Sequence, residues 1–292
     1  MLSILIPVYN YNVVPLVLEL HKQCLECEID FEIKVIDDGS KLYIDENQEI
    51  NSLSNCHFEV LAKNIGRSAI RNLLAKKAEF DSLLFLDADT IPINSNFINK
   101  YIESINQGHL VILGGYRYAN IKPKDECILR YKYGKEREEQ TDTKRNLNPY
   151  QFVFSGNILI QKNIFIVTNY ASDNSFYGMD VYFAYQLFIK KIELLHIENP
   201  IYHLGLESNI VFFEKSLKAV ESRKQFLVNC EKIEKISPLI KYYNTLKKYR
   251  LLSIVIVCFS ISKPILKKLI LNKNPSLLSF DLYRLGYFCT LK

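Results

Sequence analysis

Two carboxylates one residue apart follow an unbroken apolar run in the first third of the chain. Residues 83–86 are Leu-Leu-Phe-Leu, which predicts a strand buried on both faces. Asp87 and Asp89 come directly after it, and alternate side chains of an extended chain share a face. Carboxylate oxygens suit Mg²⁺ or Mn²⁺, above all where a phosphate fills the remaining coordination positions. An acidic turn that caps the next helix would look the same, so the pair alone leaves both interpretations open.

Two earlier predicted strands also end in polar residues. The run 3–8 leads into a loop that contains Pro7 and Tyr9, and the run 31–37 ends at Asp37 and Asp38 before Gly-Ser. A carboxylate at such a strand end can accept a hydrogen bond from a nucleobase N–H or a ribose hydroxyl. An Asp-Gly turn without any ligand is the simpler alternative.

A helix is predicted from Asn64 to about residue 78. Arg67 and Arg71 stand four residues apart in it, so they share one helix face. A guanidinium group can hold a phosphate through its fork of N–H donors, although solvated arginines on a helix are commoner.

These strands must be positioned by the helices between them, and the alternation predicts a doubly wound α/β fold with a mostly parallel sheet. Open sheets of this class bind ligands beyond the carboxyl ends of their strands. Further along, residues 122–148 predict a charged loop with a surface helix, and 152–160 predict a strand with a kink at Gly156. A polar loop at 172–178, a helix at 179–188 and short strands at 192–197 and 201–205 are expected to follow.

The composition limits the class of protein. The chain has 292 residues, is 48% hydrophobic and carries a formal net charge of +5, which excludes a disordered chain and is too slight to indicate a nucleic-acid partner. Seven scattered cysteines form no disulfide pattern, and Cys24 and Cys27 lack a second ligand pair for zinc. The first residues predict a strand and not a leader peptide. We therefore expect a cytoplasmic protein.

Four motifs occur together in a fixed order. They are Pro7-Val8-Tyr9-Asn10, Asp37-Asp38-Gly39-Ser40, the segment 64–72 and Asp87-Ala88-Asp89. In this order and spacing they resemble the family 2 glycosyltransferases, which have a GT-A fold with a Rossmann-like, mostly parallel sheet flanked by helices and use nucleotide-diphosphate sugars. The resemblance covers residues 1–118 and extends to about 210. It implies a catalytic domain at 1–212, with a donor half at 1–118 and an acceptor half at 119–212, followed by a helical region at 213–292.

The resemblance implies roles for the residues of the donor half. Asp87 would meet the ribose or the cation, Ala88 would be one of the nucleotide-binding residues, and Asp89 would ligate Mn²⁺ or Mg²⁺. The remaining nucleotide-binding residues would hold the base and the diphosphate; they are Pro7, Tyr9, Asp37, Asp38, Asn64, Arg67 and Arg71.

In the acceptor half, Tyr177-Gly178-Met179-Asp180 resembles the Gly-Glu-Asp element of the family, whose Asp is the catalytic base of inverting members. Met179 stands where Glu is usual and Tyr182 replaces a second acid, which bears on acceptor recognition. The alternative for Asp180 is a helix cap.

Three further residues of this half have two interpretations each. His203 would complete the coordination of the cation or serve as a structural hydrogen-bonding residue. Gly156 and Asn157 resemble the wall of the sugar pocket, and a strand bulge would look the same.

The function implied is inverting transfer of a sugar from a nucleotide-diphosphate donor, with UDP expected, to a hydroxyl of a glycan or lipid-linked acceptor in bacterial-type polysaccharide or surface glycan synthesis. A non-catalytic nucleotide-sugar-binding module is an alternative, as the departures at Met179 and Tyr182 suggest. A nucleotidyltransferase is another, although the chain has no Gly-rich triphosphate loop.

The segment 241–270 raises the question of a membrane. Lysines and an arginine flank a run of about a dozen mostly apolar residues at 251–262, which is shorter than the roughly 20 residues that span a bilayer. The pattern predicts either an interfacial helix at the inner face of an anionic membrane or a helix packed on the rest of the chain with solvated lysines.

Overall fold

The computed structural model describes residues 1–170 and 176–292, and these form two compact units. The first unit comprises Met1–Ala119, Glu139–Ser175 and Gln186–Gly205, and the second comprises Asn120–Glu138, Phe176–Tyr185 and Leu206–Lys292. Segments from the middle of the chain therefore share a unit with the carboxyl-terminal helices. The domain boundary predicted at residue 212 stays a prediction.

A seven-stranded sheet forms the centre of the first unit, with the strand order β3-β2-β1-β4-β8-β6-β9. Strand β8 runs antiparallel to β4 and β6, and the other neighbours are parallel, which confirms the predicted mostly parallel α/β sheet. The strands are β1 (Leu2–Val8), β2 (Phe31–Asp37), β3 (Cys56–Val60), β4 (Ser82–Leu86), β6 (Val111–Leu113), β8 (Asn157–Gln161) and β9 (Leu195–His196).

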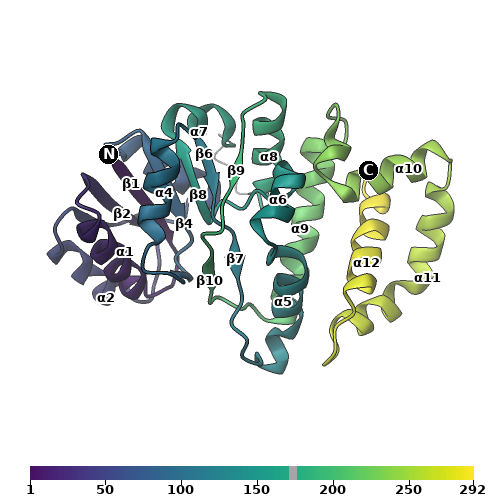
Figure 1. The fold of residues 1–292 in the computed structure, drawn as a ribbon. Helices are drawn as coiled ribbons and strands as arrows, with labels where there is room; N and C mark the ends of the chain where they lie inside the picture. The colour runs from purple at the N-terminus through teal and green to yellow at the C-terminus, as the bar shows by residue number, and fades with distance from the viewer. Residues whose placement is uncertain (171–175) are drawn as a thin grey trace. The chain divides into compact units, whose positions relative to one another are not determined.

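The central strands are almost fully buried because helices cover the sheet. Every residue of β4 is buried, as its continuous apolar sequence predicts. Helix α1 packs against α4, and α3 packs against α7; Figure 1 shows α1 and α4 alongside the strands. The helices of this unit are α1 (Val14–Glu26), α2 (Ile44–Gln48), α3 (Arg67–Lys77), α4 (Phe97–Asn106), α6 (Asp142–Leu147) and α7 (Lys162–Thr168), with 3₁₀ turns at Glu49–Ser52 and Pro149–Phe152.

A second, three-stranded sheet in the same unit carries the segment that follows β4. Its strands are β5 (Thr90–Pro92), β7 (Tyr116–Arg117) and β10 (Ile201–His203), in the order β5-β10-β7. The antiparallel register of β10 with β5 pairs His203 with Thr90. Residues more than a hundred positions apart in the sequence, Asp89 and His203, are thereby brought together.

Two predictions about the middle of the chain are wrong in detail. The strand predicted at 152–160 begins only at Asn157, because a 3₁₀ turn extends to Phe152 and residues 155 and 156 form another turn; the Phe154 ring lies 5.4 Å from that of Tyr116. The region 122–148 is more ordered than a loop with one surface helix: it contains α5 (Ile128–Tyr133), α6 and a π-helical turn, and Arg145 is buried. The loop predicted at 172–178 lies mostly outside the described residues.

The second unit is helical. An aromatic and aliphatic core holds it together, including Leu129, Phe213, Phe280 and Tyr283. Its helices are α5 (Ile128–Tyr133), the π-helical turn Gly134–Glu138, the start of α8 (Asp180–Ile189), α9 (Asn209–Leu227), α10 (Pro238–Lys248), α11 (Leu252–Ile270) and α12 (Leu277–Thr290), with 3₁₀ turns at Asp125–Cys127 and Ile233–Lys235.

Within residues 1–170 and 176–292, no individual helix combines the length and apolarity needed to cross a bilayer. Helices α10 and α11, which are bent by 120° relative to each other, reach the required length and apolarity only when they are taken together.

Candidate functional site

The carboxylates at the end of β2 order the loop that follows it, and Asp38 joins this loop to the start of α3. Asp37 is fully buried, and its Oδ1 accepts a hydrogen bond from Ser40 N–H at 2.6 Å. Asp38 accepts from the N–H groups of Ile65 at 2.7 Å and Gly66 at 3.0 Å. Burial raises the pKa of Asp38, although these two bonds oppose the rise. The Asp38 carboxylate therefore shapes the loop that precedes α3, whatever else it binds.

Gly39 lets that loop approach closely. Its φ of +74° lies in the region that favours glycine, and a Cβ there would come within 2.9 Å of the Asn64 nitrogen. The motifs at 37–40 and 64–72, which sequence analysis treats as separate, are thus one structural feature.

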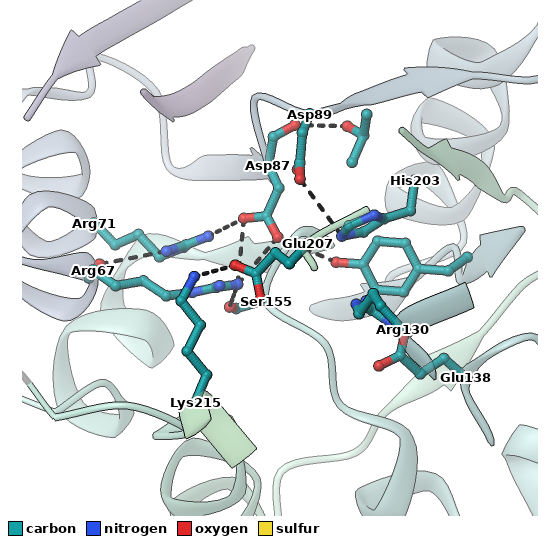
Figure 2. Close-up of polar contacts among 12 residues, drawn as sticks. Arg67, Arg71, Asp87, Asp89, Arg130, Glu138, Ser155, His203, Glu207 and Lys215 are labelled. Carbon is teal, nitrogen blue, oxygen red and sulfur yellow. Dashed lines mark hydrogen bonds and ion pairs between the residues drawn. The ribbon is translucent and has the colours of Figure 1, made fainter. Parts of the chain in front are cut away.

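Asp87 lies between two arginines of α3 (Figure 2). Arg71 is buried and donates from Nη2 to Asp87 Oδ1, whereas Arg67 is half exposed and donates to Asp87 Oδ2 at 3.1 Å. Burial acts to raise the pKa of Asp87, but the charges of Arg67, Arg71 and His203 outweigh it and lower that pKa to about 2. Asp87 is therefore an anion at any physiological pH.

Gly156 lies directly against this carboxylate. Its carbonyl accepts a hydrogen bond from Asp87 N–H at 3.1 Å, and a Cβ added to it would overlap Asp87 Oδ2 and the Tyr116 hydroxyl. The Tyr116 hydroxyl itself lies 3.5 Å from Asp87 Oδ2. The absence of a side chain at residue 156 is what allows Asp87 to occupy this position.

Asp89 faces His203 at the edge of the small sheet. Its Oδ2 lies 3.7 Å from His203 Nε2, and its backbone carbonyl accepts from Leu204 N–H at 2.8 Å. Burial raises the pKa of Asp89, His203 lowers it and Asp87 raises it further. The rings of Tyr118 and Tyr116 both lie 5.7 Å from the His203 ring. Figure 2 shows the His203 ring turned toward Asp89.

Asn157, predicted in the sugar pocket, is buried and fully bonded within the protein. Its Oδ1 accepts from the Tyr101 hydroxyl at 2.6 Å, and its Nδ2 donates to the carbonyls of Gly115 and Asn199. Its side chain therefore holds the chain near Gly115 in place. Contact with a sugar stays a prediction for both Gly156 and Asn157.

Asp180 and Met179 belong to the second unit. Asp180 is the first residue of α8, half exposed, and Met179 is buried, with its carbonyl accepting from Phe183 N–H at 2.9 Å. Gly178, with φ +77°, lies against Ala219 of α9. Burial lowers the pKa of Arg223 to about 10, and Asp180 is among the groups that oppose this. The position of Asp180 in the first turn of α8 agrees with the helix predicted at 179–188.

The other predicted nucleotide-binding residues lie at or beyond the ends of the neighbouring strands. Pro7 is in β1 beside the end of β2, Tyr9 is exposed just beyond β1, Asn64 is exposed before α3, and Ala88 separates the two aspartates. All of them lie in the first unit with Asp87 and Asp89. Their contacts with a nucleotide stay predictions.

Sequence reasoning missed two kinds of residue. Tyr116 and Tyr118 alternate along β7 and its continuation, and this spacing places both beside His203, so the alternation was a usable signal. Arg145 lies in the charged segment 122–148, which the sequence predicted to be a loop with a surface helix. It is buried and donates to the carbonyls of Leu113, Gly114 and Ile197, and Gly115, with φ +87°, leaves room for its guanidinium group.

Comparison with known proteins places these features in a family. The family model described as Glycosyl transferase family 2 matches residues 3–168. Among curated proteins, the chain is 26% identical over 223 residues to a hyaluronan synthase of Pasteurella multocida, covering 64% of this chain and 22% of that protein. It is 34% identical over 124 residues to a chondroitin synthase of Escherichia coli, covering 41% of this chain and 18% of that protein. The chain spans about a fifth of the length of these relatives.

Solved structures show the same fold. TarS of S. aureus superposes with a TM-score of 0.54 at 18% identity, covering 82% of this chain and 42% of that one. TarS 1–349 in complex with UDP-GlcNAc superposes with a TM-score of 0.52 at 16% identity, covering 98% and 90%. Their agreement with the α/β sheet and helical carboxyl-terminal part confirms the predicted fold class.

Proposed function

The chain belongs to glycosyl transferase family 2, and from this premise we propose that it transfers a sugar from a UDP-linked donor to a hydroxyl of a glycan or lipid-linked acceptor, with inversion at the anomeric carbon. The observation that carries the proposal is the group formed by Asp87, Asp89 and His203 at the carboxyl end of β4. Open α/β sheets bind ligands at this edge. The relatives named as polysaccharide synthases and the UDP-GlcNAc complex of TarS support the donor class and bacterial-type glycan synthesis.

In this proposal the loops after β1 and β2 receive the base and ribose. Tyr9 and Asp38 lie on those loops, Pro7 lies in β1, and Asn64 lies on the loop before α3, which Asp38 holds through the N–H groups of Ile65 and Gly66. Arg67 is the more accessible of the two arginines: its side chain is 47% exposed, whereas that of Arg71 is 4% exposed. We assign Arg67 to the diphosphate and Arg71 to holding Asp87 in place.

The residues present fit a divalent cation bound together with the donor. Asp89 and His203 supply one carboxylate and one imidazole 3.7 Å apart; the carboxylate suits Mn²⁺ or Mg²⁺, and the imidazole favours Mn²⁺ of the two. Burial raises the pKa of Asp89, and a bound cation would oppose this rise. When bound, such a cation would neutralise charge on the departing diphosphate.

No group of three or more His, Cys, Asp or Glu side chains gathers for a metal among residues 1–170 and 176–292. Two protein ligands leave the remaining positions to diphosphate oxygens, so we expect the cation and nucleotide to bind together. Mn²⁺ alone should leave the melting temperature unchanged, whereas UDP with Mn²⁺ should raise it. A full shift with Mn²⁺ alone would contradict this assignment.

Asp180 is the proposed base that takes the proton of the acceptor hydroxyl as it attacks the anomeric carbon. Asp180 stands in the first turn of α8 and is half-buried. The variant Asp180→Asn should keep the donor-induced thermal shift and lose turnover. Retention of near-normal turnover would show that another group is the base.

A panel of nucleoside diphosphates and their sugars, with and without Mn²⁺, tests the whole proposal by thermal shift, because only ligands of the native state raise its stability.

Met179 and Tyr182 stand where the family usually has acidic residues, and this departure favours one competing function, a nucleotide-sugar-binding module without transfer. Slow release of UDP from the preferred donor in the absence of acceptor would support the enzyme. Tight donor binding without any release would support the binding module.

The place of action in this proposal is the cytoplasm, at the inner face of the membrane, where a lipid-linked acceptor is accessible. The seven free cysteines support a reducing compartment.

A further inference from the structure

Helix α11 presents an apolar row to solvent. Ile254, Val257, Ile261 and Ile265 recur at intervals of three or four residues, so they lie on one side of the helix, and all four are more than half exposed. The row continues at Leu269, which is exposed as well. Single exposed apolar residues are ordinary, but an aligned row of five is not.

The opposite side of the same helix is already occupied. Phe259 packs edge-to-face on Tyr283 of α12 at a centroid distance of 5.1 Å, and Gly286 leaves the space that the Phe259 ring fills. Ile270 is fully buried in the same core. These contacts fix which side of α11 faces outward, so the exposed row is a property of the folded unit.

The charge around this row is of one sign. Residues 235–280 contain 9 of the 37 basic residues of the chain and none of its 32 acidic residues, so the rest of the chain is net negative by four. The basic residues stand on α10, on the carboxyl-terminal half of α11 and in the segments beside them; they are Lys235, Lys241, Lys247, Lys248, Arg250, Lys263, Lys267, Lys268 and Lys273. No charged residue interrupts the row between Leu251 and Ser262.

Two exposed tyrosines accompany the lysines. Tyr242 and Tyr249 lie on and just after α10, with exposed fractions of 61% and 65%, and Lys248 Nζ lies 6.0 Å from the Tyr249 ring centre. Tyrosine is enriched at the level of lipid headgroups because its ring is apolar and its hydroxyl is polar.

We propose that the outer side of α11, with the basic residues and tyrosines around it, docks on the interface of an anionic lipid bilayer. An interfacial helix buries its apolar side about 5–10 Å into the headgroup region while lysines contact anionic headgroups. A second copy of the chain is the less suitable occupant, because pairing this surface with itself would bring two basic surfaces together without acidic partners. The proposal does not rest on transfer activity, since vesicle binding is measured without donor or acceptor.

The absence of tryptophan from the sequence gives a direct measurement. Ile261→Trp places a single emitter in the middle of the row, and Ile121→Trp places one at an equally exposed position of the same unit, 75% against 73%. With vesicles of phosphatidylcholine and phosphatidylglycerol in equal parts, the emission of Ile261→Trp should move to shorter wavelength and be quenched by brominated acyl chains. The emission of Ile121→Trp should stay unchanged.

Co-sedimentation with the same vesicles separates the apolar and electrostatic contributions. Ile261→Glu should lower the bound fraction about tenfold or more, while Ile121→Glu should bind as wild type does. Lys247→Gln with Lys268→Gln should also lower binding about tenfold or more, because each basic residue near an anionic surface contributes roughly a fivefold factor. The exposed pair Lys22→Gln and Lys76→Gln is the control for the same loss of charge.

Circular dichroism and melting temperature establish that each variant is folded. Binding should weaken in about 1 M salt, where the Debye length falls to about 3 Å, and should be absent with phosphatidylcholine alone. The proposal is overturned if wild-type protein stays in the supernatant with anionic vesicles, or if Ile261→Glu binds as wild type does. It is equally overturned if light scattering shows a dimer that Ile261→Glu dissociates and vesicles do not bind.

Discussion

At the scale of single residues, Asp87 and Asp89 are two carboxylates of one motif with opposite electrostatic surroundings. Asp87 is paired with Arg67 and Arg71, which hold its pKa at about 2, whereas burial raises the pKa of Asp89. The first carboxylate is paired with two arginines, whereas the second lies 3.7 Å from the imidazole of His203. This difference favours Asp89 over Asp87 as the group that meets a cation.

The low pKa of Asp87 predicts a pH-dependent contribution to stability. Because this pKa lies below the ordinary value of 3.8, the contribution is complete above that value and is lost as the pH falls toward 2. Asp87→Asn should lower the free energy of unfolding by on the order of 2 kcal/mol at pH 7, with the difference from wild type shrinking between about pH 5 and pH 2. Denaturant unfolding across this range measures it, with the exposed Asp81→Asn as control.

Asp89 should behave in the opposite way. Its pKa is raised by burial, so ionisation weakens the folded state as the pH rises through that pKa. Asp89→Asn should therefore have a higher melting temperature than wild type at pH 7 without ligand, and a smaller gain at pH 4. The same variant should lose the stabilisation by UDP with Mn²⁺ and the cation-dependent transfer. A lower melting temperature at pH 7 would show that the carboxylate is already satisfied in the protein.

At the scale of elements, α6 is attached to the sheet by the buried side chain of Arg145. The guanidinium group donates to three carbonyl groups and contacts His196 Nδ1 at 3.3 Å, and His196 Nε2 lies 3.0 Å from the Pro149 carbonyl. With Arg145 donating to Nδ1, the ring proton belongs on Nε2. Burial lowers the pKa of His196 to about 4, consistent with a neutral ring.

Arg145→Met should lower the free energy of unfolding by on the order of 3 kcal/mol, because it leaves several buried carbonyl groups without donors. Arg145→Lys should restore only part of this, since one ammonium group cannot reproduce the planar fork. Lys144→Met, at the neighbouring exposed position, should be nearly neutral. Denaturant unfolding compares the three; equal stability of Arg145→Met and wild type would show that water can replace the guanidinium group.

Elements differ in how far their sequence determines them. The buried strand 83–86 and the helix of Arg67 and Arg71 follow from local patterns, and both are present. The strand predicted at 152–160 is shortened because turns at 149–152 and 155–156 take up its first half. The pairing of Asp89 with His203 depends on the register of β5 with β10, which no local pattern encodes. Local patterns thus predicted the strand before Asp87 and the helix that carries Arg67 and Arg71, whereas the pairing of Asp89 with His203 was implied only by the family resemblance.

At the scale of the whole molecule, the sequence suggested consecutive regions, but the second unit draws on segments far apart in the chain. Leu129 of α5 is fully buried with Phe213 of α9 and Phe280 of α12, and Arg130 pairs with Glu138 at 3.0 Å beside the Phe212 ring. A boundary at residue 212 separates Leu129 from most of this core. The two divisions of the chain therefore predict different outcomes for α5 when the chain is cut at residue 212.

Hydrogen exchange distinguishes the two divisions of the chain. In a fragment that ends at residue 212, α5 should lose protection because Phe213 and Phe280 no longer cover Leu129, and loss of a buried core contact lowers the free energy of local opening. Strands β1 and β4, whose neighbours in the sheet all precede residue 212, should keep the protection that they have in the 292-residue chain and serve as the internal control. Full protection of α5 in the fragment would instead establish the acceptor half as an independent folding unit, and protection lost throughout would show that the sheet itself depends on the carboxyl-terminal helices.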